Sequence, residues 1–248
     1  SLDELTYRQE YEGSFVNFSG RAYYPFDKLT HCAQLKYDPK QPLIFVFDFN
    51  VEPGVCAVIQ EQVLPKQYLH STDGTILLDK PITGTGIIGE VHIPRNSNTP
   101  AVCRRLIQDW GKHPSAVRCY GDATGGARGT AKISGSDWDL IRAELKSTFG
   151  DRLSFRVKDG NPKERARINA VNSRLKSASG DVRMLVDAAK APHVVTDFEG
   201  VILLKGGSGE IDKLSTPALT HVSDAVGYYI EYEFPVESQT AKHIKIGG

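Results

Sequence analysis

The most regular apolar stretch of the chain is residues 43–47, an unbroken run that ends in a carboxylate, Asp48. Such a run predicts a strand that is buried on both faces, in the middle of a sheet. Turn-forming residues follow over 50–54, and a second apolar stretch over 55–59 predicts a neighbouring strand. A charge at the end of a buried strand is costly unless it is satisfied, either as a cap of the turn or by a bound metal ion.

The later apolar patterns predict strands in succession, and then strands that alternate with helices. Strands are expected over 66–70, 86–93, 116–120 and 153–157, and less regular apolar stretches follow at 182–186 and 194–204. Helices are expected from the N-cap residues Thr99, Ser136 and Asn161, and over 219–234. This order predicts an α/β fold, in which a mixed sheet is flanked by helices and an antiparallel meander is continued by parallel strands.

The two ends of the chain lack these patterns. Residues 1–40 are polar with scattered aromatic residues, which predicts an irregular arm that packs its rings on the main domain. Residues 236–248 predict a polar tail. No boundary is evident within 41–235, so this range is expected to form one domain.

Composition narrows the choice of function only slightly. The 248 residues include 30 Lys and Arg and 30 Asp and Glu, so a nucleic-acid role would have to rest on local basic clusters. Four cysteines without a CxxC spacing indicate buried thiols and a reducing compartment. The sequence contains no P-loop and no GxSxG motif, and the GxGxxG match at 84–89 leads into a strand pattern instead of a helix.

Three carboxylates are distinguished by their positions. Asp48 and Asp122 each follow a predicted strand, and Asp224 lies in the last predicted helix. Because the carboxyl ends of neighbouring parallel strands meet at one edge of a sheet, the three side chains could form an all-oxygen site. Such a site suits Mg²⁺ or Mn²⁺, and two ions roughly 3.5–4 Å apart could hydrolyse a phosphodiester, with Asp48 as the bridging ligand.

Two further residues are candidate helpers of these carboxylates. His221 shares one face of the last helix with Asp224, so it could orient Asp224 or a phosphate, or only cap the start of the helix. Glu90 lies on the 86–93 strand, where a solvated charge is the commoner interpretation. The sequence does not distinguish Asp187 and Asp197 from surface charges.

Basic residues cluster at two places that could contact a DNA backbone. Lys163, Arg167 and Arg174 share roughly one face of the predicted 161–177 helix. Arg128 and Lys132 lie in the glycine-rich loop that follows Asp122. A basic loop beside a carboxylate site could follow phosphates, although any one of these residues is more commonly a solvated charge.

The order of the motifs resembles the ribonuclease H-like superfamily, and more closely the C-terminal nuclease domain of the large terminase subunit of tailed bacteriophages. The resemblance spans nearly the whole chain and is carried by residues 7–15 with 24–27, 47–53, 121–125, 167–172 and 221–228. It implies that Asp48, Asp122 and Asp224 bind the catalytic metal ions. It also implies that residues 1–40 join a packaging ATPase domain that lies outside this chain.

The resemblance further implies a function in viral genome packaging. The expected activity is cleavage of concatemeric viral double-stranded DNA in the host cell cytoplasm, with the small terminase subunit and the portal as partners and no membrane. Two alternatives stay open. One is a Holliday-junction resolvase or a transposase/integrase-type nuclease of the same superfamily. The other is a non-catalytic DNA-binding or docking module whose acidic residues only cap strands and turns.

Overall fold

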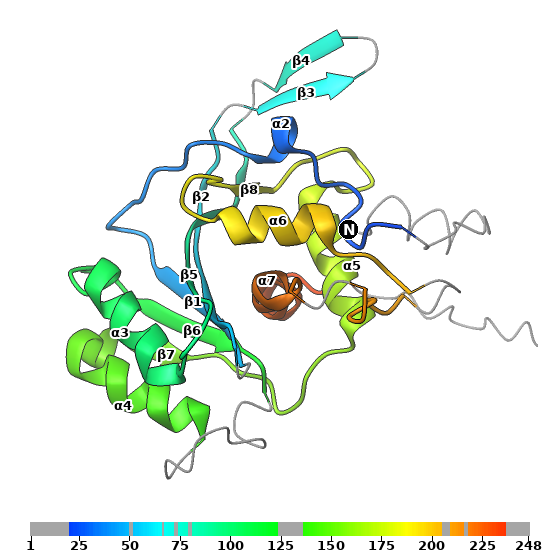
Figure 1. The fold of residues 1–248 in the computed structure, drawn as a ribbon. Coiled ribbons are helices and arrows are strands. Elements are labelled where there is room, and N and C mark those ends of the chain that lie inside the picture. The colour runs from blue at the N-terminus through cyan, green and yellow to red at the C-terminus, as the bar shows by residue number, and fades with distance from the viewer. Residues whose placement is uncertain are drawn as a thin grey trace, which may run out of the picture.

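The computed structural model describes residues 20–49, 52–65, 67–71, 74–78, 81–123, 136–204, 209–215 and 218–236 (Figure 1). A six-stranded sheet has the order β7-β6-β1-β2-β5-β8. Its strands are β1 Leu43–Asp48, β2 Gly54–Val63, β5 Thr83–Ile93, β6 Val117–Gly121, β7 Leu153–Phe155 and β8 Met184–Val186. β1, β2 and β5 pair in antiparallel fashion, whereas β6, β7 and β8 each join in parallel. The predicted mixed sheet, a meander continued by parallel strands, is therefore confirmed.

Helices cover both faces of this sheet, which gives three layers (Figure 1). α3 Thr99–Trp110 and α4 Asp137–Phe149 lie on one face, and α5 Glu164–Leu175, α6 Pro192–Gly200 and α7 His221–Glu233 lie on the other. Two short helices complete the set, α2 Lys28–His31 and the 3-10 helix η1 Gly150–Arg152. α7 packs against β1, β2 and β6 as well as α5 and α6, so it is enclosed by the sheet and its neighbouring helices.

The unbroken apolar run in β1 follows from this layering. Ile44 and Val46 pack in the core beneath α5–α7, whereas Phe45 and Phe47 pack in the core beneath α3 and α4. Since side chains alternate along a strand, Asp48 is on the face that α7 covers. The pattern that makes β1 a central strand thus also fixes the direction of its terminal carboxylate.

Several predicted elements differ from the structure. The strand expected at 66–70 does not continue the meander; β3 Gln67–Ser71 pairs with β4 Gly74–Leu78 in a separate two-stranded sheet. The 194–204 stretch is largely helical, as α6. Asn98, not Thr99, caps α3. α5 begins at Glu164, because the side chain of Asn161 has another partner.

The described part of the N-terminal arm is attached to the domain by its rings. Tyr23 and Phe26 are buried beside Phe198 of α6. Cys56, Cys103 and Cys119 are buried and all four cysteines are free, as predicted. Within the described ranges, no helix combines the length and apolar character needed to cross a membrane.

Candidate metal centre

The register of two parallel strands places Asp48 and Asp122 side by side. Phe47 of β1 is paired with Gly121 of β6, and the two aspartates are the next residues of their strands. The Asp122 N–H donates to the Phe47 carbonyl at 3.3 Å. A Cβ on Gly121 would lie only 2.3 Å from that carbonyl oxygen, so the close approach of the two strand ends requires glycine.

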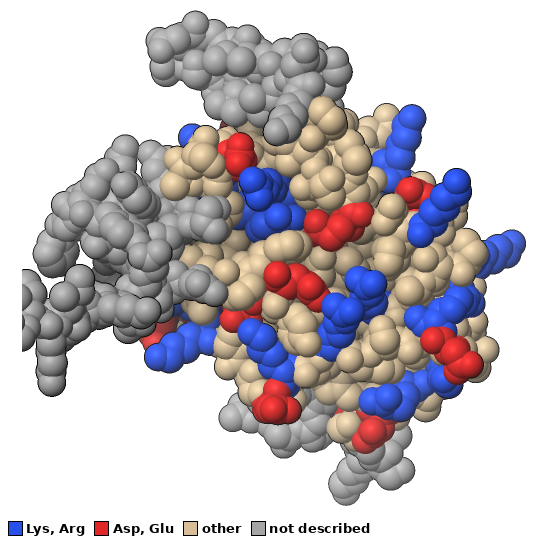
Figure 2. All heavy atoms as spheres, turned by 180° about the vertical axis from the view of Figure 1, so that it is seen from behind, with Lys and Arg blue, Asp and Glu red and all other residues tan. Residues whose placement is uncertain are grey.

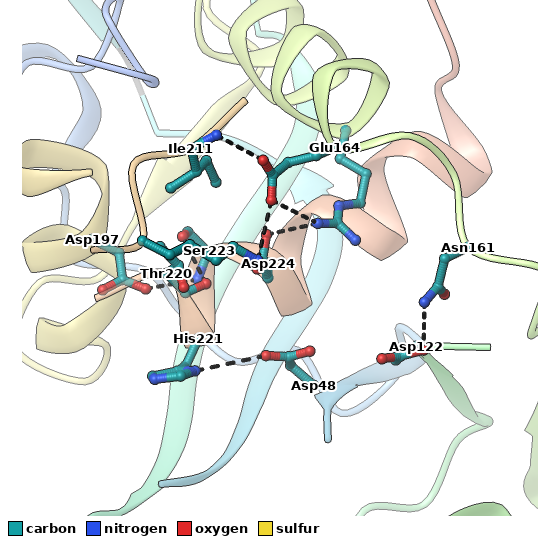
Figure 3. A network of polar contacts seen from close by, with 12 residues as sticks. Asp48, Asp122, Asn161, Glu164, Asp197, Ile211, Thr220, His221, Ser223 and Asp224 are labelled. Carbon is teal, nitrogen blue, oxygen red and sulfur yellow. Dashed lines mark hydrogen bonds and ion pairs between the residues drawn. The ribbon is translucent and has the colours of Figure 1, made fainter. Parts of the chain in front are cut away.

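α7 brings Asp224 to the same place, and a buried carboxylate of α6 fixes where α7 begins. Thr220 precedes the helix with φ 88° and makes no side-chain cap. Asp197 instead accepts the N–H groups of Val222 at 3.1 Å and Ser223 at 2.9 Å (Figure 3). Burial raises the pKa of Asp197 to about 6, against the lowering effect of these hydrogen bonds. Asp197 is therefore a structural cap and not a surface charge.

Asp224 is buried with Arg167, and the partly exposed Glu164 and the exposed Lys213 complete a group of two acids and two bases. Arg167 Nη2 is 3.0 Å from Asp224 Oδ1, and Lys213 Nζ is 3.8 Å from Oδ2. Lys213 Nζ also lies 3.2 Å from Glu164 Oε1, and Glu164 accepts the Ile211 N–H at 2.7 Å. Burial raises the pKa of Asp224, the two cations oppose this, and Glu164 adds to it. The Asp224 carboxylate is thus largely removed from water, and Arg167 and Lys213 stabilise its negative charge.

The other two aspartates have partners of their own (Figure 3). His221 Nδ1 lies 4.0 Å from Asp48 Oδ2. Asn161 Nδ2 donates to Asp122 Oδ1 at 2.6 Å, while Asn161 Oδ1 accepts the Ala123 N–H at 2.8 Å. Asn161 was predicted to cap a helix, and its contact with Asp122 was not foreseen.

Asp48, Asp122 and Asp224 all affect the pKa of one neighbouring residue, Tyr228. Burial raises the pKa of Tyr228, and the charges of Asp48, Asp122 and Asp224 all raise it further. In the part of the chain that the structure describes, no three His, Cys, Asp or Glu side chains are close enough to hold one ion as they stand. The donor set nevertheless fits Mg²⁺ or Mn²⁺, because it consists of carboxylate oxygens around a desolvated acid.

Glu90 does not belong to this group. Its side chain is only 5% exposed and accepts the N–H groups of His193 at 3.0 Å and Val194 at 3.1 Å, so it caps α6. His193 Nδ1 lies 2.5 Å from the same carboxylate. Both expectations for Glu90, a solvated charge or a helper of the carboxylates, are corrected by these contacts.

The basic residues expected to contact DNA are placed differently from one another. Arg167 and Arg174 are buried, and Arg174 pairs with Glu61 at 3.0 Å. Both arginines are thus committed to the interior, which corrects that expectation. Lys163 is exposed, and Arg128 and Lys132 lie outside the described residues. Figure 2 shows Lys and Arg interspersed with Asp and Glu over one face, without a continuous basic surface.

Comparison with solved structures agrees with this architecture. The large terminase from a thermophilic bacteriophage matches with a TM-score of 0.55 at 12% identity, over 91% of this chain and 48% of that one. The complex of that terminase with ADP matches with a TM-score of 0.56 at 12% identity, over 89% and 46%. This chain has a terminase-like fold. It spans about half the length of the terminases that it matches.

A more distant match is the g2p (large terminase) nuclease domain from bacteriophage SPP1 with bound Mn. Its TM-score is 0.39 at 13% identity, over 77% of this chain and 84% of that one, which is too low to bear on the site. No family model matches the sequence, and no curated protein matches it. At these identities the likeness concerns the fold alone.

Proposed function

We propose that this chain is a metal-dependent endonuclease that cleaves concatemeric viral DNA during genome packaging. The observation that carries the proposal is the pairing of β1 with β6, which sets Asp48 beside Asp122 on the face that α7 covers with Asp224. The terminase-like fold adds support, as does the all-oxygen donor set. The ribonuclease H-like relationship is part of the same proposal.

The chain's own residues have distinct roles in this proposal. Asp48, Asp122 and Asp224 would hold two Mg²⁺ or Mn²⁺ ions, which supply activation of a water and stabilisation of the leaving oxygen of a phosphodiester. His221 orients Asp48, and Asn161 orients Asp122 through its 2.6 Å hydrogen bond. Arg167 and Lys213 hold the Asp224 carboxylate in place.

Plasmid cleavage with and without metal tests this function. Wild-type protein in Mn²⁺ should nick and linearise plasmid, and EDTA should stop it. Asp48→Asn should lower the rate at least about 100-fold, because it removes one ligand charge where charge stabilisation dominates. Asp151→Asn is the matched control, since Asp151 is fully exposed and pairs with Lys146 in the opposite layer. Cleavage that persists in EDTA or in Asp48→Asn would refute the proposal.

The same assay separates the nuclease classes. A packaging nuclease should cut linear duplex at least as well as a four-way junction, whereas a strong junction preference would favour a resolvase. The packaging ATPase domain, the small terminase subunit and the portal remain proposed partners, with the host cell cytoplasm as the proposed place of action. A lack of Mn²⁺ binding in calorimetry would instead favour a docking module.

A further inference from the structure

A pocket of about 310 Å³ lies at the edge of the sheet, beside β5 and the start of α6. Its polar lining consists of Glu90, His92, Arg105, Lys190 and His193. β8 pairs with β5 only at Thr85–Ile87, so the later part of β5 has no strand partner on that side among the described residues. The pocket therefore combines basic side chains with the backbone of an open strand edge.

The pocket lies in line with the proposed metal centre. The register of the sheet pairs Asp48 with Val55, and Val55 with His92, so these residues form one row across β1, β2 and β5. Two strand spacings separate Asp48 from His92, about 10 Å in all. Burial lowers the pKa of His92, and the charges of His193 and His221 lower it further. His221 thus acts on both ends of this row, because it also lies 4.0 Å from Asp48.

The charges of the pocket suit an anion. Glu90 is buried and already accepts two backbone N–H groups and pairs with His193 Nδ1, so its charge is largely satisfied. The side chains of Arg105, Lys190 and His193 are about half exposed, at 58%, 51% and 47%. Arg105 pairs with Asp109 and Lys190 with Asp187, and the exposed Arg105 pair is weak enough to exchange for a ligand.

The rings of His92 and His193 give the pocket a rigid wall. Their centroids are 3.7 Å apart and their planes differ by 5°. Since Nδ1 of His193 is bound to Glu90, Nε2 is the ring nitrogen that a ligand in the pocket can reach. The backbone of α6 is held by the same Glu90, so this nitrogen is presented from a fixed position.

We propose that this pocket binds a backbone phosphate of the DNA strand that is held at the three aspartates. Arg105 supplies the charge, and the stacked rings of His92 and His193 form the wall beside it. A DNA strand carries one charge per ~3.4 Å of axis, so a strand at Asp48 reaches the pocket within about three nucleotides. The choice of DNA as the ligand rests on the proposed function.

Salt-dependent DNA binding in EDTA tests the pocket apart from cleavage. A fluorescent 20-base-pair duplex is titrated at several KCl concentrations with wild-type, Arg105→Ala and Arg104→Ala proteins. Loss of one phosphate contact should make the negative slope of log K against log salt less steep by about 0.9. Arg105→Ala should therefore bind DNA several-fold more weakly than wild type at low salt. Arg104→Ala is the matched control, because Arg104 is the preceding exposed residue of α3 and does not line the pocket.

A second variant should not weaken DNA binding. Asp109→Asn removes the partner of Arg105 and should leave DNA binding as strong as in wild type, or stronger. Equal slopes for Arg105→Ala and Arg104→Ala would refute phosphate binding at the pocket, even if the protein cleaves plasmid. A lower slope for Arg105→Ala in a protein that never cleaves would instead overturn only the proposed function.

Inorganic phosphate distinguishes DNA from a small free anion. If phosphate at constant ionic strength raises the melting temperature of wild type but not of Arg105→Ala, while the DNA slopes are equal, the pocket serves a small anion. That outcome refutes the proposal. A DNA slope that depends on Arg105 supports it.

Discussion

The two faces of the sheet bury different kinds of side chain. The face beneath α3 and α4 is a continuous apolar core, with Leu106, Ile141 and Leu145 fully buried. The face beneath α5, α6 and α7 has an apolar core as well, but it also buries charged side chains. These are Arg167, Arg174, Asp197 and Asp224.

This difference separates the side chains that stabilise the fold from those that surround the proposed metal site. A buried ion pair seldom stabilises a protein more than apolar packing of the same volume would, because both charges lose their hydration. The α3–α4 face relies mainly on apolar packing. On the charged face, Arg167 and Asp197 lie beside or position Asp224, where a replacement by apolar groups would remove a carboxylate of the proposed metal site.

The charged face extends beyond the site along α5. Arg174 donates to Glu61 at 3.0 Å and to the Thr85 hydroxyl at 2.8 Å, and it lies over the ring of Phe234. Glu61 also accepts the Tyr229 hydroxyl at 3.1 Å. The two arginines of α5 thus attach α7 at two separate points, Arg167 near its start and Arg174 near its end.

The largest effect on stability is expected from Arg167→Met. It leaves Asp224 buried without its main cation, so it should cost about 3–5 kcal/mol in urea unfolding with EDTA. If Asp224 is a metal ligand, saturating Mn²⁺ should stabilise Arg167→Met more than it stabilises wild type, because the ion replaces the missing cation; the gain common to all proteins with an intact site is about 2.7 kcal/mol at 100 times the dissociation constant.

Leu145→Ala is the control from the apolar face. Leu145 is fully buried in α4, and the cavity should cost about 3 kcal/mol. Mn²⁺ should leave the difference between this variant and wild type unchanged. Equal responses of the two variants to Mn²⁺ would contradict the division between the two faces.

A smaller effect on stability is expected when the pH dependence of unfolding is compared between wild type and Asp197→Asn. The pKa of Asp197 is about 6 in the folded protein and about 3.9 when unfolded. Between these values the native state binds more protons, so the contribution of Asp197 to stability falls as pH rises from 4 to 6. The stability of wild type relative to Asp197→Asn should therefore fall by about 2–3 kcal/mol over this range and level off above pH 7.

Unfolding in urea at half-unit pH steps measures this difference. Asp224 titrates in both proteins, so the subtraction removes most of its contribution. A relative stability that rises with pH would show that the hydrogen bonds from Val222 and Ser223 outweigh burial.

The sequence predicted the strands of the main sheet, and Asp48 at the end of one of them, because both depend on local pattern. Asp48 ends a run that alternates between two cores, and that pattern is visible in the residues alone. The N-cap predicted at Ser136 is equally local, and the structure confirms it, with Asp139 completing a capping box. Such a pattern predicts the direction of a side chain relative to its own helix or strand.

Partners from distant segments could not be predicted in this way. Asp197 and Val222 are 25 residues apart, and Arg167 and Asp224 are 57 apart. An arginine on a helix has the same local pattern whether it faces DNA or a buried acid, so Arg167 and Arg174 were misassigned. The helix cap expected at Asn161 failed for a related reason, because the Ala123 N–H occupies the side-chain oxygen that a cap would need.

The smallest effect on stability, and the finest test of the comparison, is expected from Asn161→Ala. It removes two hydrogen bonds of an exposed residue, so it should cost about 1 kcal/mol or less. Residues that orient metal ligands typically change metal affinity about 10- to 100-fold, so Mn²⁺ affinity measured by calorimetry should fall about tenfold. Asp27→Ala, which removes the N-cap of α2, should cost about 1 kcal/mol and leave Mn²⁺ affinity unchanged. An equal change of Mn²⁺ affinity in both variants would mean that Asn161 acts on the fold and not through Asp122.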